Sequence, residues 1–270
     1  MKTGNVIKKA FDLYLTNPVI IVPFLILGAV TNTINFILKT FLRESFANFK
    51  FTGMQSLLFL ENISESFFQN FLQYSIFFIL IGIFILILSS FLEAYAIGLS
   101  KKLTTNKAKL SDGLSAMIHG PAIIGKNLII WLLFFAGSIV VIIPTVILFG
   151  ALGFLLATVI LFVYMAILIA VSFFANQSIV LDNVGPWEGL VGSYFFIKKN
   201  IEGVALLILF VVGIYVAFGI VQSTGATMVS YFLSETTELV VNQGLHLILY
   251  SLILYPFVLI LKTFYYIKNK

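Results

Sequence analysis

The sequence predicts an all-α, polytopic integral membrane protein: six transmembrane helices form three hairpins, and an amphipathic interfacial helix precedes each hairpin. Hydrophobic residues make up 60% of the 270 residues and charged residues only 10%, and the mean hydropathy is +1.09. Such a chain has too little polar surface to cover a water-soluble globule. Apolar runs of about 20 residues, long enough to cross a bilayer as a helix, recur along the chain. The period-two pattern of a membrane β-barrel does not appear in it.

The six expected spans follow these apolar runs, at residues 18–38, 71–99, 128–148, 154–176, 201–232 and 245–265. The second and fifth are near 30 residues, about 45 Å as helix, so they should tilt or project beyond the hydrocarbon core. The third and fourth share one apolar block, and Pro144 and the glycines of FGALGF favour a turn between them. The first run lacks the pattern of a cleavable signal peptide, so we expect it to remain as a helix.

Lysine placement predicts the orientation of the spans. With six spans, most lysines fall on one side: before the first span, between the second and third, before the fifth, and at the end of the chain. The opposite side carries an outer loop at 39–70, where Lys39, Arg43 and Lys50 are balanced by glutamates. Because short cytoplasmic loops are enriched in Lys and Arg, we expect a multi-pass protein of the cell membrane with both termini in the cytoplasm.

Three similar amphipathic segments precede the odd-numbered spans. The stretch DLYLTNPVIIVPFLIL, which begins at Asp12, and the stretch SYFFIKKNIEGVALLIL, which begins at Ser193, both lead from a mixed-polarity helix through an Asn into an apolar run. Before the third span, Ser111 can cap a short helix that Pro121 should end. We therefore expect three repeated units, at about 1–100, 101–180 and 181–270, within one transmembrane domain. The alternative is that every surface helix at a membrane needs basic and aromatic residues, which would produce the same similarity without duplication.

These helices are expected to lie flat on the inner leaflet. Lysines near an anionic surface contribute on the order of 1 kcal/mol each. The expected contacts with anionic lipid headgroups are Lys8, Lys9, Lys126, Lys198 and Lys199. Membrane lipids are thus the expected partners, together with a protein partner or a second copy of the chain, and nothing indicates nucleic-acid binding.

The later part of the chain resembles a known family. The passages FFANQSIVLDNVGPWEGLVGSYFFIKKN and YPFVLILKTFYYIKNK are similar to six-span prokaryotic membrane proteins grouped around the membrane domain of glycerophosphodiester phosphodiesterases. Asp182, Ser193, Tyr265 and Tyr266 match its pattern of an acidic turn, an amphipathic helix with a Ser, and a terminal aromatic pair. The resemblance implies the six-span fold. It implies no hydrolytic activity, because the soluble phosphodiesterase domain of some relatives does not occur in this sequence.

The sequence contains no recognisable catalytic signature. Its two histidines, His119 and His246, lie far apart, and it has no cysteine, HExxH motif, nucleophile elbow or phosphate-binding loop. We interpret both histidines as solvated or interfacial rather than as ligands. The sequence therefore predicts a protein that is not an enzyme and has no catalytic residue, metal or cofactor.

Four polar residues within the apolar runs are the candidate site residues: Glu93, Asn32, Asn35 and Gln222. Glu93 is expected near the cytoplasmic boundary, where it either pairs with a loop lysine or forms a proton or cation site. Asn32 and Asn35 share one face of the first span, and Gln222 lies at a comparable outer depth in the fifth. Hydrogen bonds between helices explain these amides more simply than a substrate site.

Two functions remain compatible with the sequence. The first is a non-enzymatic scaffold or lipid-interacting accessory protein, which we favour because few polar residues line the spans. The alternative is a transporter or lipid-translocating permease for a hydrophobic or weakly polar substrate. A scaffold predicts a closed apolar interior, whereas a transporter predicts a cavity that reaches the amides and Glu93.

Overall fold

The structure, a computed structural model, describes residues 3–46, 65–105, 107–232 and 235–270. All regular elements of these residues are helices, and six are long and apolar enough to cross a membrane. They are Pro18–Lys39, Ser75–Leu103, Leu110–Phe149, Leu152–Asp182, Ile201–Tyr231 and Val240–Asn269. The predicted fold class is confirmed at this level. Most of the expected outer loop, 47–64, lies outside the described residues, and its two edges belong to helices.

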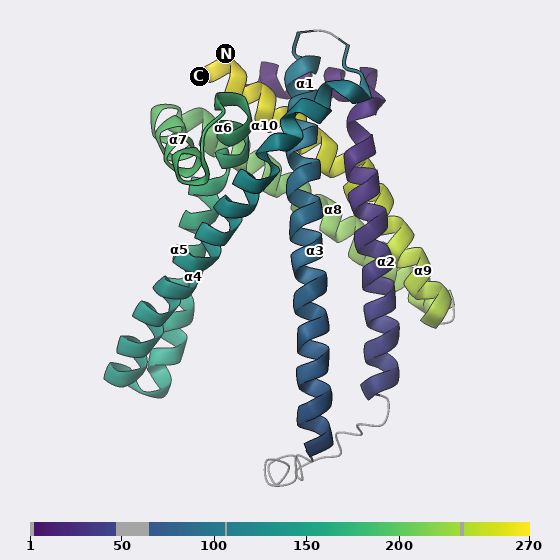
Figure 1. Cartoon of the computed structure of the whole chain (residues 1–270), viewed down its shortest axis with the longest axis vertical. Coiled ribbons are helices and arrows are strands. Elements are labelled where there is room, and N and C mark those ends of the chain that lie inside the picture. Colours follow the sequence, from purple (N-terminus) through teal and green to yellow (C-terminus); the bar gives the residue numbers. More distant parts are fainter. Residues whose placement is uncertain (1–2, 47–64, 106, 233–234) are drawn as a thin grey trace.

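The first hairpin consists of α2 (Ile21–Phe46) and α3 (Glu65–Leu103), which Figure 1 shows running side by side. The helix α1 (Thr3–Thr16) and a single 3₁₀ turn, η1 (Pro18–Ile20), precede it. With 39 residues, α3 is about 58 Å long, more than a bilayer core requires. A helix of this length fits the expectation that the second span either tilts or projects beyond the apolar layer.

The second hairpin consists of α4 (Gly120–Phe149) and α5 (Ala151–Ser172), and the 3₁₀ helix η3 (Leu110–His119) precedes it. Gly150 links the two at φ +56°, a conformation that favours glycine, so the FGALGF stretch is the predicted turn. The predicted start at residue 128 is wrong, because α4 begins at Gly120. Pro121 occupies the first turn of α4, where its missing N–H costs no hydrogen bond.

This second hairpin diverges from α2 and α3 (Figure 1). Tyr164 of α5 donates a hydrogen bond to the carbonyl oxygen of Leu133 of α4 at 2.7 Å, which joins the two helices. Large apolar side chains on both helices, including Val140, Ile147 and Phe162, are exposed. In a bilayer these surfaces are compatible with lipid, because acyl chains need no polar partner.

The third hairpin consists of α8 (Ile201–Phe232) and a return helix in three parts. Its parts are α9 (Glu235–His246), a π-helical segment η4 (Leu247–Leu254) and α10 (Tyr255–Asn269). Two short helices, α6 (Ala175–Asp182) and α7 (Pro186–Lys199), connect α5 to this hairpin. The return helix is longer than the predicted span, which began at residue 245.

The helices α1, η3, α6 and α7 lie at the same end of the molecule as both chain ends, and we call them the collar (Figure 1). The same kind of local hydrogen bond occurs at two junctions between the collar and a span. The Asn17 side chain donates to the Leu13 carbonyl oxygen, and the Asn200 side chain to that of Phe196, each at 3.0 Å. Both are local bonds to a carbonyl oxygen four residues earlier, and the repeat stays a prediction. Placement of the collar on the cytoplasmic membrane surface stays a prediction.

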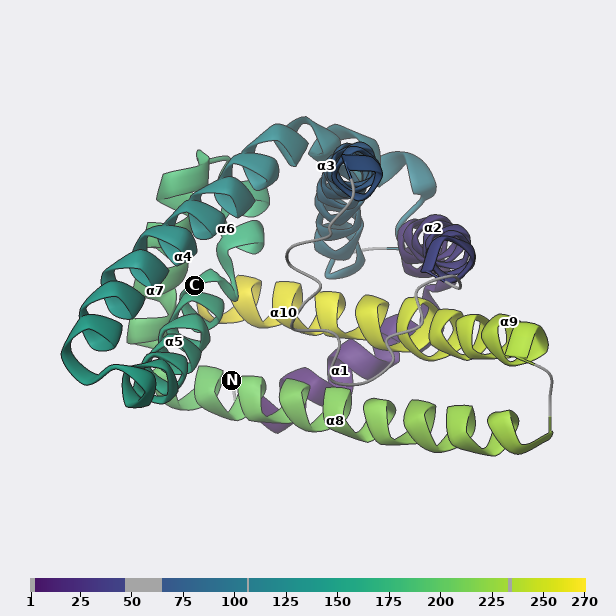
Figure 2. The same ribbon diagram turned by 90° about the horizontal axis from the view of Figure 1, so that it is seen from below.

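The core of the collar end forms around α10, which passes between α8 and the α2–α3 hairpin (Figure 2). Most of its residues from Pro256 to Tyr266 are buried. Three rings meet there: the centroid of Phe174, in the turn between α5 and α6, lies 4.9 Å from that of Phe196 of α7 and 6.0 Å from that of Tyr265 of α10. This aromatic packing fixes α10 at the centre, where it can position the side chains of a site.

A hydrogen bond joins α1 to the return helix. Pro256 has no N–H for the carbonyl oxygen of Leu252 four residues earlier. The Tyr14 hydroxyl of α1 donates to that oxygen at 2.9 Å. Burial raises the pKa of Tyr14 above its ordinary value, so the phenol keeps the proton that it donates.

We expect Tyr14→Phe to lower the free energy of unfolding by about 1 kcal/mol, the usual net value of one such bond. Thermal unfolding of the detergent-solubilised protein, followed by the loss of its monodisperse elution peak, measures this. Tyr194→Phe on the exposed face of α7 is the matched control, and it should leave the midpoint unchanged. Equal midpoints for the Tyr14 variant and the wild type would show that the bond contributes nothing.

Candidate ligand cavity

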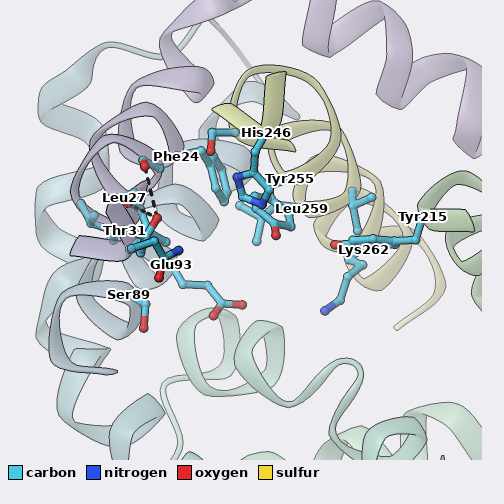
Figure 3. Close-up of a pocket in the computed structure, with 15 residues that line it drawn as sticks. Phe24, Leu27, Thr31, Ser89, Glu93, Tyr215, His246, Tyr255, Leu259 and Lys262 are labelled. Carbon is cyan, nitrogen blue, oxygen red and sulfur yellow. Dashed lines mark hydrogen bonds between the residues drawn. The ribbon is translucent and has the colours of Figure 1, made fainter. Parts of the chain in front are cut away.

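A cavity of about 440 Å³ lies between the first and third hairpins. Figure 3 shows its lining side chains, which come from α2, α3, α8 and the three parts of the return helix. The lining residues are Phe24, Leu27, Gly28, Thr31, Asn35, Ser89, Leu92, Glu93, Tyr215, His246, Ser251, Tyr255, Val258, Leu259 and Lys262. Its volume lies within the usual range of about 300–1,000 Å³ for small-molecule sites.

Local backbone features bring the walls together. Gly28 of α2 packs against η4, and a Cβ at position 28 would lie only 2.7 Å from the Cβ of Ser251. The close approach therefore requires glycine. Extended π-helix is rare and concentrates at functional sites. Here Ser251 of the π-helical segment lines the cavity, and the next helix begins with Tyr255, whose ring lies beside Phe24 of α2 and Tyr215 of α8.

One end of the cavity carries charge. Glu93 of α3 and Lys262 of α10 both line it, and Figure 3 shows their charged groups facing the same space. Glu93 interacts electrostatically with Lys262 and also with Lys126 of α4. Within the described residues, no ion pair within 4 Å joins Glu93 to either lysine. These lysines are on helices, whereas the sequence favoured a partner in the loop.

The charges in this region do not balance. Two lysines face one carboxylate, and Lys126 is only 6% exposed. The ammonium group of Lys262 also lies 4.6 Å from the centroid of the Phe173 ring, a cation–π contact. An excess cation in low dielectric favours a further anion nearby. The charged end can therefore accept the anionic group of a ligand.

A smaller cavity of about 120 Å³ adjoins the first. Its lining residues are Asn32, Asn35, Lys39, Gln222, Asn242, Gln243 and His246. Asn35 and His246 line both cavities, so polar groups continue from Glu93 and Lys262 to Lys39. The structure thus brings Asn32, Asn35 and Gln222 together around the smaller cavity. Glu93 lines the larger cavity instead.

The expected hydrogen bond between helices exists, although its acceptor is not Gln222. The Asn32 amide donates to the backbone carbonyl oxygen of Gln243 at 3.0 Å. His246 is partly buried between the two cavities, and its ring stacks on Tyr250 with centroids 4.8 Å apart. Its Nδ1 atom is buried and has no hydrogen-bond partner among the described residues. A buried polar atom of this kind is costly unless water or a ligand meets it.

Four of the five lysines expected at lipid headgroups, Lys8, Lys9, Lys198 and Lys199, are exposed on α1 and α7. Lys126 differs from them. It lies inside α4, which begins at Gly120, and its side chain is buried and interacts electrostatically with Glu93. A headgroup contact for Lys126 therefore does not match the structure.

Sequence reasoning missed Lys262, Tyr215, Tyr255 and Ser251 as lining residues. Lys262 stands within the apolar segment YPFVLILKTFYY, much as Glu93 stands within its own run. The same argument that singled out Glu93, an ionisable residue inside a span, could have found it. The tyrosines and the serine carry no such signal.

No family model, curated protein or solved structure matches this chain. The resemblance to the membrane domain of glycerophosphodiester phosphodiesterases therefore stays a prediction. Within the described residues, no group of three or more His, Cys, Asp or Glu side chains is placed to hold a metal ion.

Proposed function

We propose that this integral membrane protein binds an amphiphile with an anionic headgroup in the cavity and moves it across the bilayer. This proposal takes up the transport alternative of the sequence analysis, but with an anionic amphiphile in place of the hydrophobic or weakly polar substrate expected there. The observation that carries it is the cavity itself, which has Glu93 and Lys262 at one end and apolar side chains along its walls. A scaffold would be expected to have a closed apolar interior instead.

The chemistry of the lining supports this class of ligand. Phe24, Leu27, Leu92, Val258 and Leu259 provide surface for an acyl chain or another apolar group. Lys262 provides a charge-assisted hydrogen bond for a phosphate or carboxylate, and hydrogen bonds to charged groups contribute about 1.5–3 kcal/mol. A fully charged, water-soluble solute would leave the apolar wall without a partner.

The adjoining amide-lined cavity supports movement rather than simple binding. Beyond Asn35 and His246 it carries amide groups and then Lys39, so hydrogen-bonding groups continue away from the charged end. Polar groups inside a membrane domain mark substrate paths when they line a cavity. The two cavities provide successive sites for one headgroup.

The test is a transfer assay in vesicles. Purified protein is reconstituted into phosphatidylcholine vesicles that contain phosphatidylglycerol with a fluorescent nitrobenzoxadiazole label, and dithionite quenches the label in the outer leaflet. We expect wild-type protein to speed transfer between leaflets, and Lys262→Gln to slow it about ten-fold or more, because the headgroup loses a charged partner.

Lys268→Gln is the matched control, since Lys268 is an exposed lysine of the same helix that does not line the cavity. It should transfer lipid at the wild-type rate. Transfer no faster than in protein-free vesicles, or equal rates for the Lys262 variant and the wild type, would contradict the proposal.

A further inference from the structure

A second, separate cavity of about 770 Å³ lies at the collar end. It is formed by the end of α3, by η3, by α6 and by the end of α10. The Tyr95 hydroxyl donates to the Leu110 carbonyl oxygen at 2.6 Å, which holds the start of η3 against α3. A Cβ at Gly98 would lie 2.5 Å from the Cβ of Ala116, so these two elements are in close contact. The walls are therefore fixed by packing within the fold.

The two acidic residues of this cavity already have partners. Asp112 accepts a hydrogen bond from the backbone N–H of Lys109 at 2.8 Å, which caps the start of η3. Asp182 accepts one from the Tyr266 hydroxyl at 2.7 Å and pairs with Lys270. Lys270 offsets Asp182, and Asp112 keeps its charge because its partner is a neutral N–H, so the lining carries one more lysine than carboxylates.

Lys101 and Lys102 are the other lysines of the lining. Both are exposed and line the cavity, and within the described part of the chain neither side chain has an ion pair or a hydrogen bond. Lysines in the last turn of a helix are favoured by its dipole, which accounts for two cations at this position. The dipole does not account for the cavity that these lysines line, or for His119 among the other lining residues.

We propose that this cavity binds a small phosphate-bearing ligand. Lys101 and Lys102 supply charge for a phosphate group, and Ala116, Val180, Leu181 and Ile267 supply apolar surface for the group attached to it. The ligand reaches the site either free in solution, as a nucleotide does, or as the headgroup of an anionic lipid. This site is independent of the transport proposal, since it shares no lining residue with the cavity of Glu93 and Lys262.

The experiment compares two ligand sources on the full chain. In nanodiscs of phosphatidylcholine alone, binding of adenosine 5′-diphosphate is measured by calorimetry. In nanodiscs that also contain phosphatidic acid, retained phosphatidic acid is counted by native mass spectrometry. We expect the double variant Lys101→Gln/Lys102→Gln to weaken the binding of either adenosine 5′-diphosphate or phosphatidic acid by at least about ten-fold. This is the effect of losing charged hydrogen bonds.

The matched control is Lys107→Gln/Lys109→Gln, which removes the same charge from exposed positions nearby that do not line the cavity. A selective loss of nucleotide binding supports a soluble ligand, and a selective loss of phosphatidic acid supports a lipid. Absence of binding in both arms, or an equal loss in the control pair, would overturn the proposal. Elution of each variant as a single peak shows that a loss of binding is not a loss of fold.

Discussion

Replacing Glu93 by Gln is expected to lower the free energy of unfolding by about 2–3 kcal/mol, because the buried Lys126 then loses its counter-charge. Glu93 interacts with both Lys126 and Lys262, and Lys126 is only 6% exposed. An ammonium group in low dielectric must then lose its proton or draw water inward, and both are costly. The thermal midpoint of the solubilised protein should fall accordingly.

Two further variants separate this charge effect from a general loss of packing. Glu202→Gln, at an exposed acid in the first turn of α8, should melt as the wild type does. The pair Glu93→Gln/Lys126→Met should recover most of the lost stability, since an apolar side chain of similar length replaces the unpaired cation. A Glu93→Gln protein as stable as the wild type would show that Glu93 is merely interfacial and that Lys126 is compensated elsewhere.

The spans could be predicted from the sequence because one property, sustained apolarity over a helical length, decides them. The break at Gly150 was also predictable, because two glycines close together favour a turn, and Gly150 does adopt a positive φ there. The start of α4 was not, because Pro121 can either end one helix or begin the next. In the structure η3 ends at His119 and α4 begins at Gly120, so Pro121 lies in the first turn of the next helix.

The cavity was only partly predictable. Asn32, Asn35 and Gln222 stood out because amides are costly in hydrocarbon, and the structure places them around one space. The acceptor for Asn32 is a backbone carbonyl, which every residue carries, so no sequence pattern could name Gln243. Glu93 and Lys262 meet through the crossing of α3 and α10, a tertiary arrangement that one sequence does not reveal.

Gly28→Leu is expected to destabilise the protein by about 3 kcal/mol or more and to abolish lipid transfer, because it forces α2 away from the π-helical segment. The new Cβ would lie 2.7 Å from the Cβ of Ser251 and 3.0 Å from Cδ1 of Leu247. Neither helix can relax without moving cavity walls, since Gly28 and Ser251 both line the cavity. Thermal midpoints and the vesicle assay measure the two effects.

The matched control is Gly82→Leu on α3, where an added Cβ has no neighbouring heavy atom within 4 Å and the side chain would face outward. It makes the same chemical change in a membrane helix, and should leave stability and transfer near the wild-type values. Gly28→Ala introduces a smaller clash, and the pair Gly28→Ser/Ser251→Gly exchanges the two side chains across the contact. The exchange should recover stability, because the helices can again approach each other. If Gly28→Leu transferred lipid at the wild-type rate, the space between α2 and the return helix would not be the path, because its wall would have moved without consequence.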